Sequence, residues 1–212
     1  MQNLELNPNV EYILGADISM SMETIDPLCG GQTRYNYMLE KFQSFIKTAE
    51  DFDEHGAPTI ILFGENVKIY EHVKLDDIRS KLNSIVFEGF TNLHLLIEEA
   101  YKLHREDKSE LAKEKKFHPG TKLLVFTDGE PTNKPAVERI IARIANEIDT
   151  QEEFQIMFLT VGTISPGLQR WLDGLHDKME DKIINPRDFD IIHISPLEKI
   201  SFLGAVGANK HD

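Results

Sequence analysis

Five short apolar runs, separated by longer amphipathic stretches, constrain the fold of this chain more than any other feature. The runs lie at 12–16, 59–63, 123–126, 156–159 and 191–194. Their hydrophobicity is continuous rather than alternating, which is typical of strands covered on both faces, as in a parallel sheet between layers of helices. The pattern therefore predicts an α/β protein with a mostly parallel, doubly wound sheet.

The stretches between these runs carry apolar residues at helical spacing. The longest apolar stripes lie at 35–49, 93–103 and 137–148, and shorter helices are expected over 75–83 and 168–175. A regular alternation of strand and helix is typical of a Rossmann-like sheet with helices on both faces.

One segment breaks the alternation. Only Gly64, Glu65 and Asn66 separate the run at 59–63 from another short run at 67–70. So short a connection joins strands as a hairpin, because a parallel connection needs a longer crossover. The strand at 67–70 is therefore expected to be antiparallel and to lie at the edge of the sheet.

Composition narrows the classes of function. The 212 residues include 36 acidic and 23 basic side chains, a formal charge of −13, which argues against a general nucleic-acid binder and against binding to anionic membranes. A lone cysteine, Cys29, excludes an internal disulfide, and neither a signal peptide nor a membrane-spanning run is visible. We expect one cytoplasmic domain over 1–212, with its core from about 10 to 202 and frayed residues after 204. The oligomeric state is not predicted.

Short oxygen-bearing side chains follow or precede the elements that this fold brings to one edge of the sheet. Asp17, Ser19 and Ser21 follow the first run, Thr91 precedes the helix at 93–103, and Asp128 follows the run at 123–126. The carboxyl ends of parallel strands share one edge, where ligands bind. The first three residues alternate along an expected extended loop, so that they can point the same way. Two carboxylates and three hydroxyls are hard donors that suit Mg²⁺ or Mn²⁺ better than zinc.

These residues form a recognisable tripartite motif. Asp17-x-Ser19-x-Ser21, then Thr91, then Thr127-Asp128-Gly129 resembles the metal-ion-dependent adhesion site (MIDAS) of von Willebrand factor type A domains. The resemblance covers about 10 to 202 and includes the element order and the edge hairpin. The chain departs from many relatives at Met20 and Phe90, neither of which is a ligand.

The resemblance implies a role for each matched residue. Ser19, Ser21 and Thr91 would coordinate the metal directly, and Asp17 and Asp128 directly or through water. Two carboxylates balance a divalent ion formally, but three neutral hydroxyls leave it electrophilic, with one octahedral position open to an Asp or Glu of a partner protein. The implied function is metal-dependent protein–protein interaction without catalysis. Stand-alone bacterial domains of this type resemble those encoded with tellurite-resistance and stress-response proteins.

Two other interpretations of the motif are open. Asp17, Ser19 and Ser21 are also common caps of helices and turns, a purely structural role. Alternatively, Asp17 is the nucleophile of a magnesium-dependent phosphohydrolase with Asp128 on the metal. Such enzymes usually need a second acid two residues on, where this chain has Ser19. Serine-hydrolase and nucleotide-binding motifs do not occur.

A few remaining residues are assigned structural roles. His94 is expected at the surface or behind the metal ligands, His193 as a hydrogen-bonded core residue, Cys29 as a reduced thiol and Trp171 as a packing residue. The charged span at 105–116 is expected to be a solvated helix end and loop.

Overall fold

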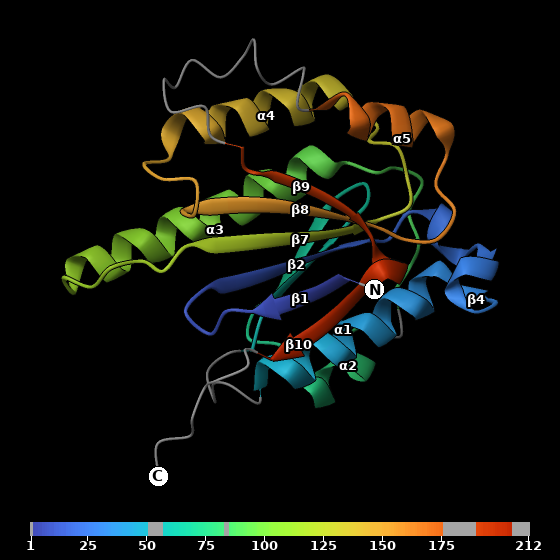
Figure 1. Cartoon of the computed structure of the whole chain (residues 1–212), viewed down its shortest axis with the longest axis horizontal. Helices are drawn as coiled ribbons and strands as arrows, with labels where there is room; N and C mark the ends of the chain where they lie inside the picture. Colours follow the sequence, from blue (N-terminus) through green and yellow to red (C-terminus); the bar gives the residue numbers. More distant parts are fainter. Residues whose placement is uncertain (1, 51–56, 83–84, 176–189, 205–212) are drawn as a thin grey trace.

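Figure 1 shows the computed structural model of the chain, which describes residues 2–50, 57–82, 85–175 and 190–204. Its central sheet has six strands in the order β6-β5-β2-β7-β8-β9. These are β2 (Glu11–Asp17), β5 (Thr59–Phe63), β6 (Val67–Tyr70), β7 (Thr121–Thr127), β8 (Phe154–Thr160) and β9 (Ile192–Pro196). Within this sheet only β6 is antiparallel, paired with β5 at the edge, so the predicted hairpin is confirmed.

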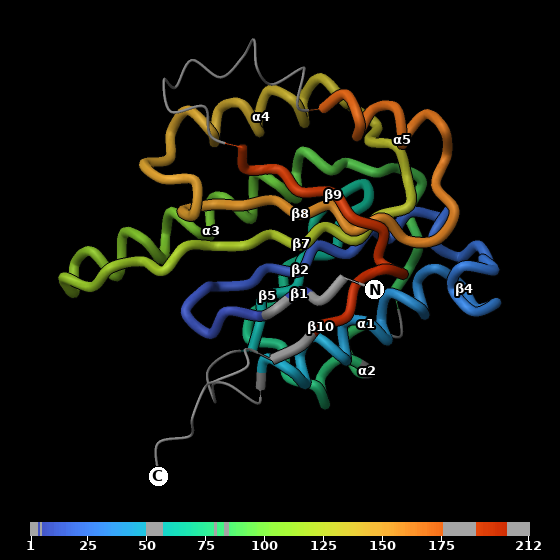
Figure 2. The backbone as a smooth tube through the Cα atoms, viewed as in Figure 1, coloured from blue at the N-terminus to red at the C-terminus, as the bar shows by residue number. Residues whose placement is uncertain are grey.

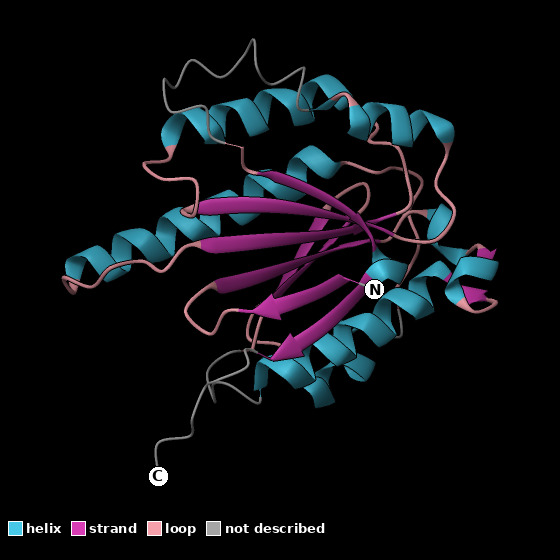
Figure 3. Ribbon diagram, viewed as in Figure 1, coloured by secondary structure: helices cyan, strands magenta, loops and turns pink. Residues whose placement is uncertain are grey.

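Helices cover both faces of the sheet, as Figure 3 shows. On one face lie α1 (Arg34–Glu50) and α2 (Leu75–Leu82), and on the other lie α3 (Leu93–Lys113), α4 (Lys134–Glu147) and α5 (Pro166–Asp173). Successive strand residues enter opposite layers, for example Ile13 toward α3 and Leu14 toward α1. Both layers exclude water, which is why the strands read as continuous apolar runs. The predicted fold class is confirmed.

Two terminal strands were not predicted from the sequence. β1 (Gln2–Leu6) and β10 (Ile200–Gly204) form a separate parallel pair, with Gln2 opposite Ile200 and Leu6 opposite Gly204. The pair lies beside α1, where Lys41 Nζ donates to the carbonyl of Ile200 at 3.2 Å. The fraying expected after 204 lies outside the described residues.

The order of the strands determines where the candidate site lies. After β2 the chain adds β5 and β6 on one side, and it then crosses through α3 to place β7 on the other side of β2 (Figure 2). The carboxyl ends of β2 and β7 are therefore adjacent where the strand order reverses, the usual ligand position in open α/β sheets.

Two predictions for single residues had different outcomes. Trp171 is buried, with its ring edge-on to Phe158 and its Nε1 donating to Glu138 Oε1 at 3.2 Å, which confirms a packing role. The prediction that His193 lies in the core is wrong, because His193 is exposed on β9. β9 is an edge strand of the sheet, so its apolar neighbours do not imply burial on both faces.

The charged end of α3 is solvated, as predicted, with Arg105, Glu110 and Lys113 exposed. None of the helices in the described part of the chain is long and apolar enough to cross a membrane.

Candidate metal-binding site

The first part of the motif begins where β2 ends. Asp17 is the last residue of this strand and is fully buried. Its Oδ1 accepts the N–H of Ser19 at 2.8 Å, and its Oδ2 accepts the hydroxyl of Thr127 at 2.5 Å. Because each carboxylate oxygen has its own donor, the carboxylate is held in one orientation at the sheet edge.

Ser19 and Ser21 reach the site differently from the prediction. Ser19 has extended backbone, but Ser21 lies in a one-turn 3₁₀ helix (Met20–Glu23) and not in an extended loop. The tight turn still brings the two hydroxyls to 3.0 Å from each other, and Ser21 Oγ donates to Asp128 Oδ1 at 2.8 Å. The alternation was therefore a poor guide to the local backbone, although the side chains do come together.

Backbone pairing holds Thr91 between the first and third parts of the motif. Ser19 pairs with Glu88 in an isolated parallel bridge, in which the N–H of Met20 donates to the Glu88 carbonyl at 2.9 Å. On the other side, the N–H of Thr91 donates to Thr132 Oγ1 at 3.0 Å, and the N–H of Thr132 donates to the Thr91 carbonyl at 3.0 Å. The loop before α3 thus connects both neighbouring loops.

The space beside Gly129 shows that the three parts converge. A Cβ atom built on Gly129 would lie 3.2 Å from Thr91 Oγ1 and 3.7 Å from both Asp17 Oδ2 and Ser21 Oγ. Together with the contacts of Ser19 and Asp128, this geometry gathers all five sequence-predicted residues around one space. Hydroxyl and carboxylate oxygens around a common space fit Mg²⁺ or Mn²⁺. The described residues contain no metal-binding group of three or more His, Cys, Asp or Glu side chains, so hydroxyls are essential to this donor set.

Without a cation beside it, the protein environment disfavours the ionised form of Asp17. Burial raises the pKa of Asp17 to about 7, and the negative charge of Asp128 adds to the rise, against hydrogen bonds from Thr127 and Ser19 that lower it. A bound cation would favour the ionised form.

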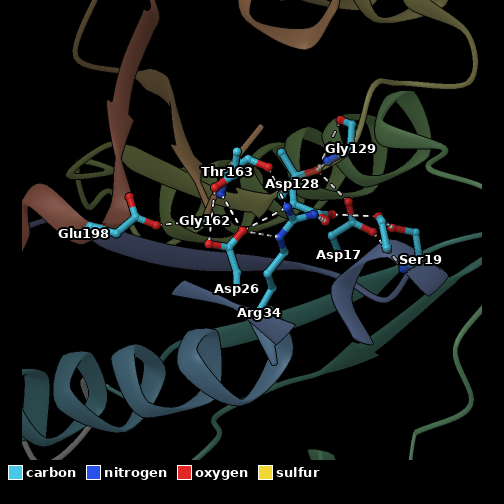
Figure 4. Close-up of polar contacts among 11 residues, drawn as sticks. Asp17, Ser19, Asp26, Arg34, Asp128, Gly129, Gly162, Thr163 and Glu198 are labelled. Carbon is cyan, nitrogen blue, oxygen red and sulfur yellow. Dashed lines mark hydrogen bonds and ion pairs between the residues drawn. The ribbon is translucent and has the colours of Figure 1, made fainter. Parts of the chain in front are cut away.

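Sequence reasoning missed Arg34, the first residue of α1. Its guanidinium lies between two carboxylates, with Nη1 donating to Asp128 Oδ2 and with Nη2 and Nε donating to Asp26 Oδ2 at 2.9 and 3.1 Å (Figure 4). A cation in the first turn of a helix opposes the helix dipole. This position, just before the stripe at 35–49, is the one signal in the sequence that bears on Arg34, and it identifies no partner.

Asp26 is itself a fixed part of the network. It accepts the N–H of Leu28 at 2.9 Å and the N–H of Thr163, from the loop after β8, at 2.7 Å. Burial acts to raise the pKa of Asp26, but these hydrogen bonds and Arg34 outweigh it and hold the pKa below its ordinary value. Asp26 is therefore a charged carboxylate with several donors.

Two further residues near the motif have defined environments. His94 is partly buried in the first turn of α3, and its Nδ1 has no hydrogen-bond partner among the described residues. Cys29 is fully buried, and burial raises the pKa of its thiol to about 11.

Comparison with known proteins supports the fold. No family model and no curated protein matches the chain. Among solved structures, manganese-loaded TRAP from Plasmodium vivax superposes with a TM-score of 0.55 at 16% identity, covering 89% of this chain and 68% of that one. The N-terminal domain of TFIIH p34 gives 0.55 at 10% identity, covering 82% and 90%. Proximal thread matrix protein 1 of the mussel byssus gives 0.52 at 13% identity, covering 92% of this chain but only 45% of its own.

At these identities the likeness shows the fold alone. It is the α/β fold expected from the resemblance to von Willebrand factor type A domains.

Proposed function

We propose that this chain is a protein-interaction module that depends on a divalent metal, with Mg²⁺ or Mn²⁺ held by Asp17, Ser19, Ser21, Thr91 and Asp128. The observation that carries the proposal is the convergence of hydroxyl and carboxylate oxygens from three loops on the space beside Gly129. When bound, the ion would supply an electrophilic centre for a carboxylate of the partner. The residues of this chain orient the oxygen ligands and exclude water from the carboxylates.

The surface of the motif loops suits a partner protein. Met20 and Phe90, next to proposed ligands, are 63% and 50% exposed. Ile25, in the two-residue strand β3 (Ile25–Asp26), and Leu28, in the 3₁₀ helix Pro27–Cys29, are 68% and 57% exposed. These exposed apolar side chains flank the proposed site, and we place the contact with the partner there. We propose a partner that supplies an Asp or Glu next to apolar side chains. A cytoplasmic role in bacterial stress or tellurite response is the biological context that we infer from the resemblance.

Metal binding is tested by thermal unfolding. Mg²⁺ or Mn²⁺ added to chelator-treated protein should raise the Tm, because the ion binds only the folded arrangement. Asp17→Ala should abolish the rise, whereas Asp76→Ala, at an exposed position on α2, should retain it. A rise that persists in Asp17→Ala would show that the ion binds elsewhere.

Metal-dependent recognition is tested separately from metal binding. Thr91→Ala should reduce capture of a protein partner as severely as chelator does while leaving the fold intact, because it removes one oxygen from a loop. The net charge of −13 repels an acidic partner at long range, so the attraction must be local to the ion. Partner capture should therefore depend less on salt than on metal. Capture that withstands both Thr91→Ala and chelator would place the interaction elsewhere.

The geometry gives no support to the phosphohydrolase alternative. A nucleophilic carboxylate needs access to substrate, but Asp17 is fully buried and both of its oxygens accept hydrogen bonds. With Mg²⁺ present, we expect no turnover of phosphate esters above that of Asp17→Ala. Turnover that requires Asp17 would favour the enzyme.

A further inference from the structure

Arg34 places a fixed positive charge against one of the two carboxylates of the candidate site. Its Nη1 donates to Asp128 Oδ2, while the other oxygen of this carboxylate accepts the Ser21 hydroxyl at 2.8 Å. The side chains of Arg34 and Asp128 are 12% and 0% exposed, so water screens the pair poorly. A divalent ion that uses Asp128 therefore meets a carboxylate that already has a cationic partner.

Asp26 holds the opposite side of the same guanidinium. In Figure 4, Arg34 lies between Asp26 and Asp128. Asp26 takes two donors of Arg34, and a further hydrogen bond runs from Arg34 Nη2 to the carbonyl of Thr163 at 2.5 Å. Asp128 takes only Nη1. The position of the guanidinium charge is thus set mainly by its contacts on the side away from the metal ligands.

We propose that Arg34 is the resident counter-ion of the metal site: it competes with the divalent ion for Asp128, and Asp26 determines how strongly it competes. This inference rests on the proposed function. A guanidinium bonded to Asp128 reduces the negative charge that this carboxylate offers to a second cation. By sharing the guanidinium, Asp26 weakens its hold on Asp128. Without metal, the same contact limits the repulsion between Asp17 and Asp128.

A purely structural role for Arg34 leads to a different expectation. Arg34 also connects α1 with the loop after β8 through Thr163, so its loss would reduce stability in any case. A structural tie, however, gives no reason for metal affinity to increase when Arg34 is removed. The sign of the change in metal affinity therefore separates the two roles.

The experiment measures the Kd of Mn²⁺ and of Mg²⁺ by titration calorimetry, and the Tm in chelator. Arg34→Gln should tighten the Kd by about tenfold, because it removes a unit charge from a poorly screened contact. Asp26→Asn should weaken the Kd, because Arg34 then bonds only Asp128 among the carboxylates. Both variants should have a lower Tm without metal. Lys47→Gln removes the same charge from an exposed position on α1 and should leave the Kd unchanged.

The double variant separates competition from a general field effect. If Asp26 acts through Arg34, Asp26→Asn should change the Kd much less in the Arg34→Gln background than in the wild type. Equal weakening in both backgrounds, or an unchanged or weaker Kd in Arg34→Gln, would overturn the proposal. If Arg34→Gln does not fold, an unchanged Kd in Asp26→Asn would still overturn the proposal. If the wild-type protein binds neither ion, the proposed function itself is wrong. If the wild type binds an ion but the variants leave the Kd unchanged, only the role of Arg34 is wrong.

Discussion

Thr127 donates its hydroxyl to Oδ2 of Asp17 at 2.5 Å, between the ends of two adjacent parallel strands. The bond lies in the interior of the protein, since Asp17 is 0% and Thr127 2% exposed. Thr127 belongs to the Thr-Asp-Gly segment of the motif but is not among the proposed ligands. Its role is to hold a carboxylate that burial would otherwise disfavour.

Thr127→Val should therefore cost about 1–3 kcal/mol in free energy of unfolding, the usual cost of removing a partner from a buried polar group. Urea unfolding of the metal-free protein measures it. Thr160→Val, at the position opposite Thr127 on β8, is the matched control and should cost less. Equal losses in the two variants would mean that the bond to Asp17 is not the cause.

Gly129→Ala should abolish the rise in Tm caused by Mg²⁺ or Mn²⁺ while leaving the metal-free fold intact. The added methyl group would lie 3.2 Å from Thr91 Oγ1, in the space on which the proposed ligands converge. Thermal unfolding with and without metal checks this. Gly89→Ala is the control, because its Cβ would approach nothing closer than 3.8 Å. A full metal response in Gly129→Ala would place the ion away from this space.

Cys29 should be almost unreactive in the native protein. Its thiol is buried, and a pKa of about 11 leaves very little thiolate at pH 8. Labelling with a thiol-specific reagent at pH 8 should be slow without denaturant and rapid in urea. Rapid native labelling would instead support a redox role for this cysteine.

The contribution of His104 to stability should decrease as the pH drops below 6.5. Its Nδ1 lies 3.0 Å from Thr121 Oγ1, and its Nε2 lies 3.4 Å from Glu153 Oε1. Burial lowers the pKa of His104, and the charge of His118 adds to this. The unfolded chain then binds more protons than the folded protein from pH 6.5 down to the lowered pKa, so protonation favours unfolding there.

Relative to the wild type, His104→Asn should become more stable as the pH falls from 7.5 to 5.5, because asparagine does not titrate. Urea unfolding across this range gives the two slopes. Asp17 and Asp107, whose pKa values burial raises to about 7 and about 6, act in the opposite direction, since their protonation stabilises the fold. Both groups are present in both proteins, so the difference between the slopes is the test. Identical slopes would exclude His104 as the source.

The fold could be predicted because its signals are local. Continuous apolar runs and helical stripes each lie within a few turns of chain, and the three-residue connection after Phe63 allows only a hairpin. The proposed ligands could be located for a related reason, since parallel strands bring their carboxyl ends together regardless of their separation in sequence. Asp17 and Asp128 are brought together by this rule alone.

What escaped prediction depends on contacts that no local rule describes. Arg34 bonds Asp26, eight residues away, and Asp128, 94 residues away, so no spacing relates the three. β1 is five residues long and pairs only with β10, almost 200 residues later in the sequence. The exposure of His193 depends on whether its strand is central or at an edge, and composition does not show this.

The pairing of β1 with β10 has a mechanical consequence. Because the strands are parallel, Gln2 at the start of β1 and Gly204 at the end of β10 lie at opposite ends of the pair. A force that draws these two residues apart acts along the strands, so it loads the whole ladder of hydrogen bonds at once and does not open them one at a time. A tether that pulls on both terminal strands would meet its first resistance in this pair, at a distance in sequence from every proposed metal ligand.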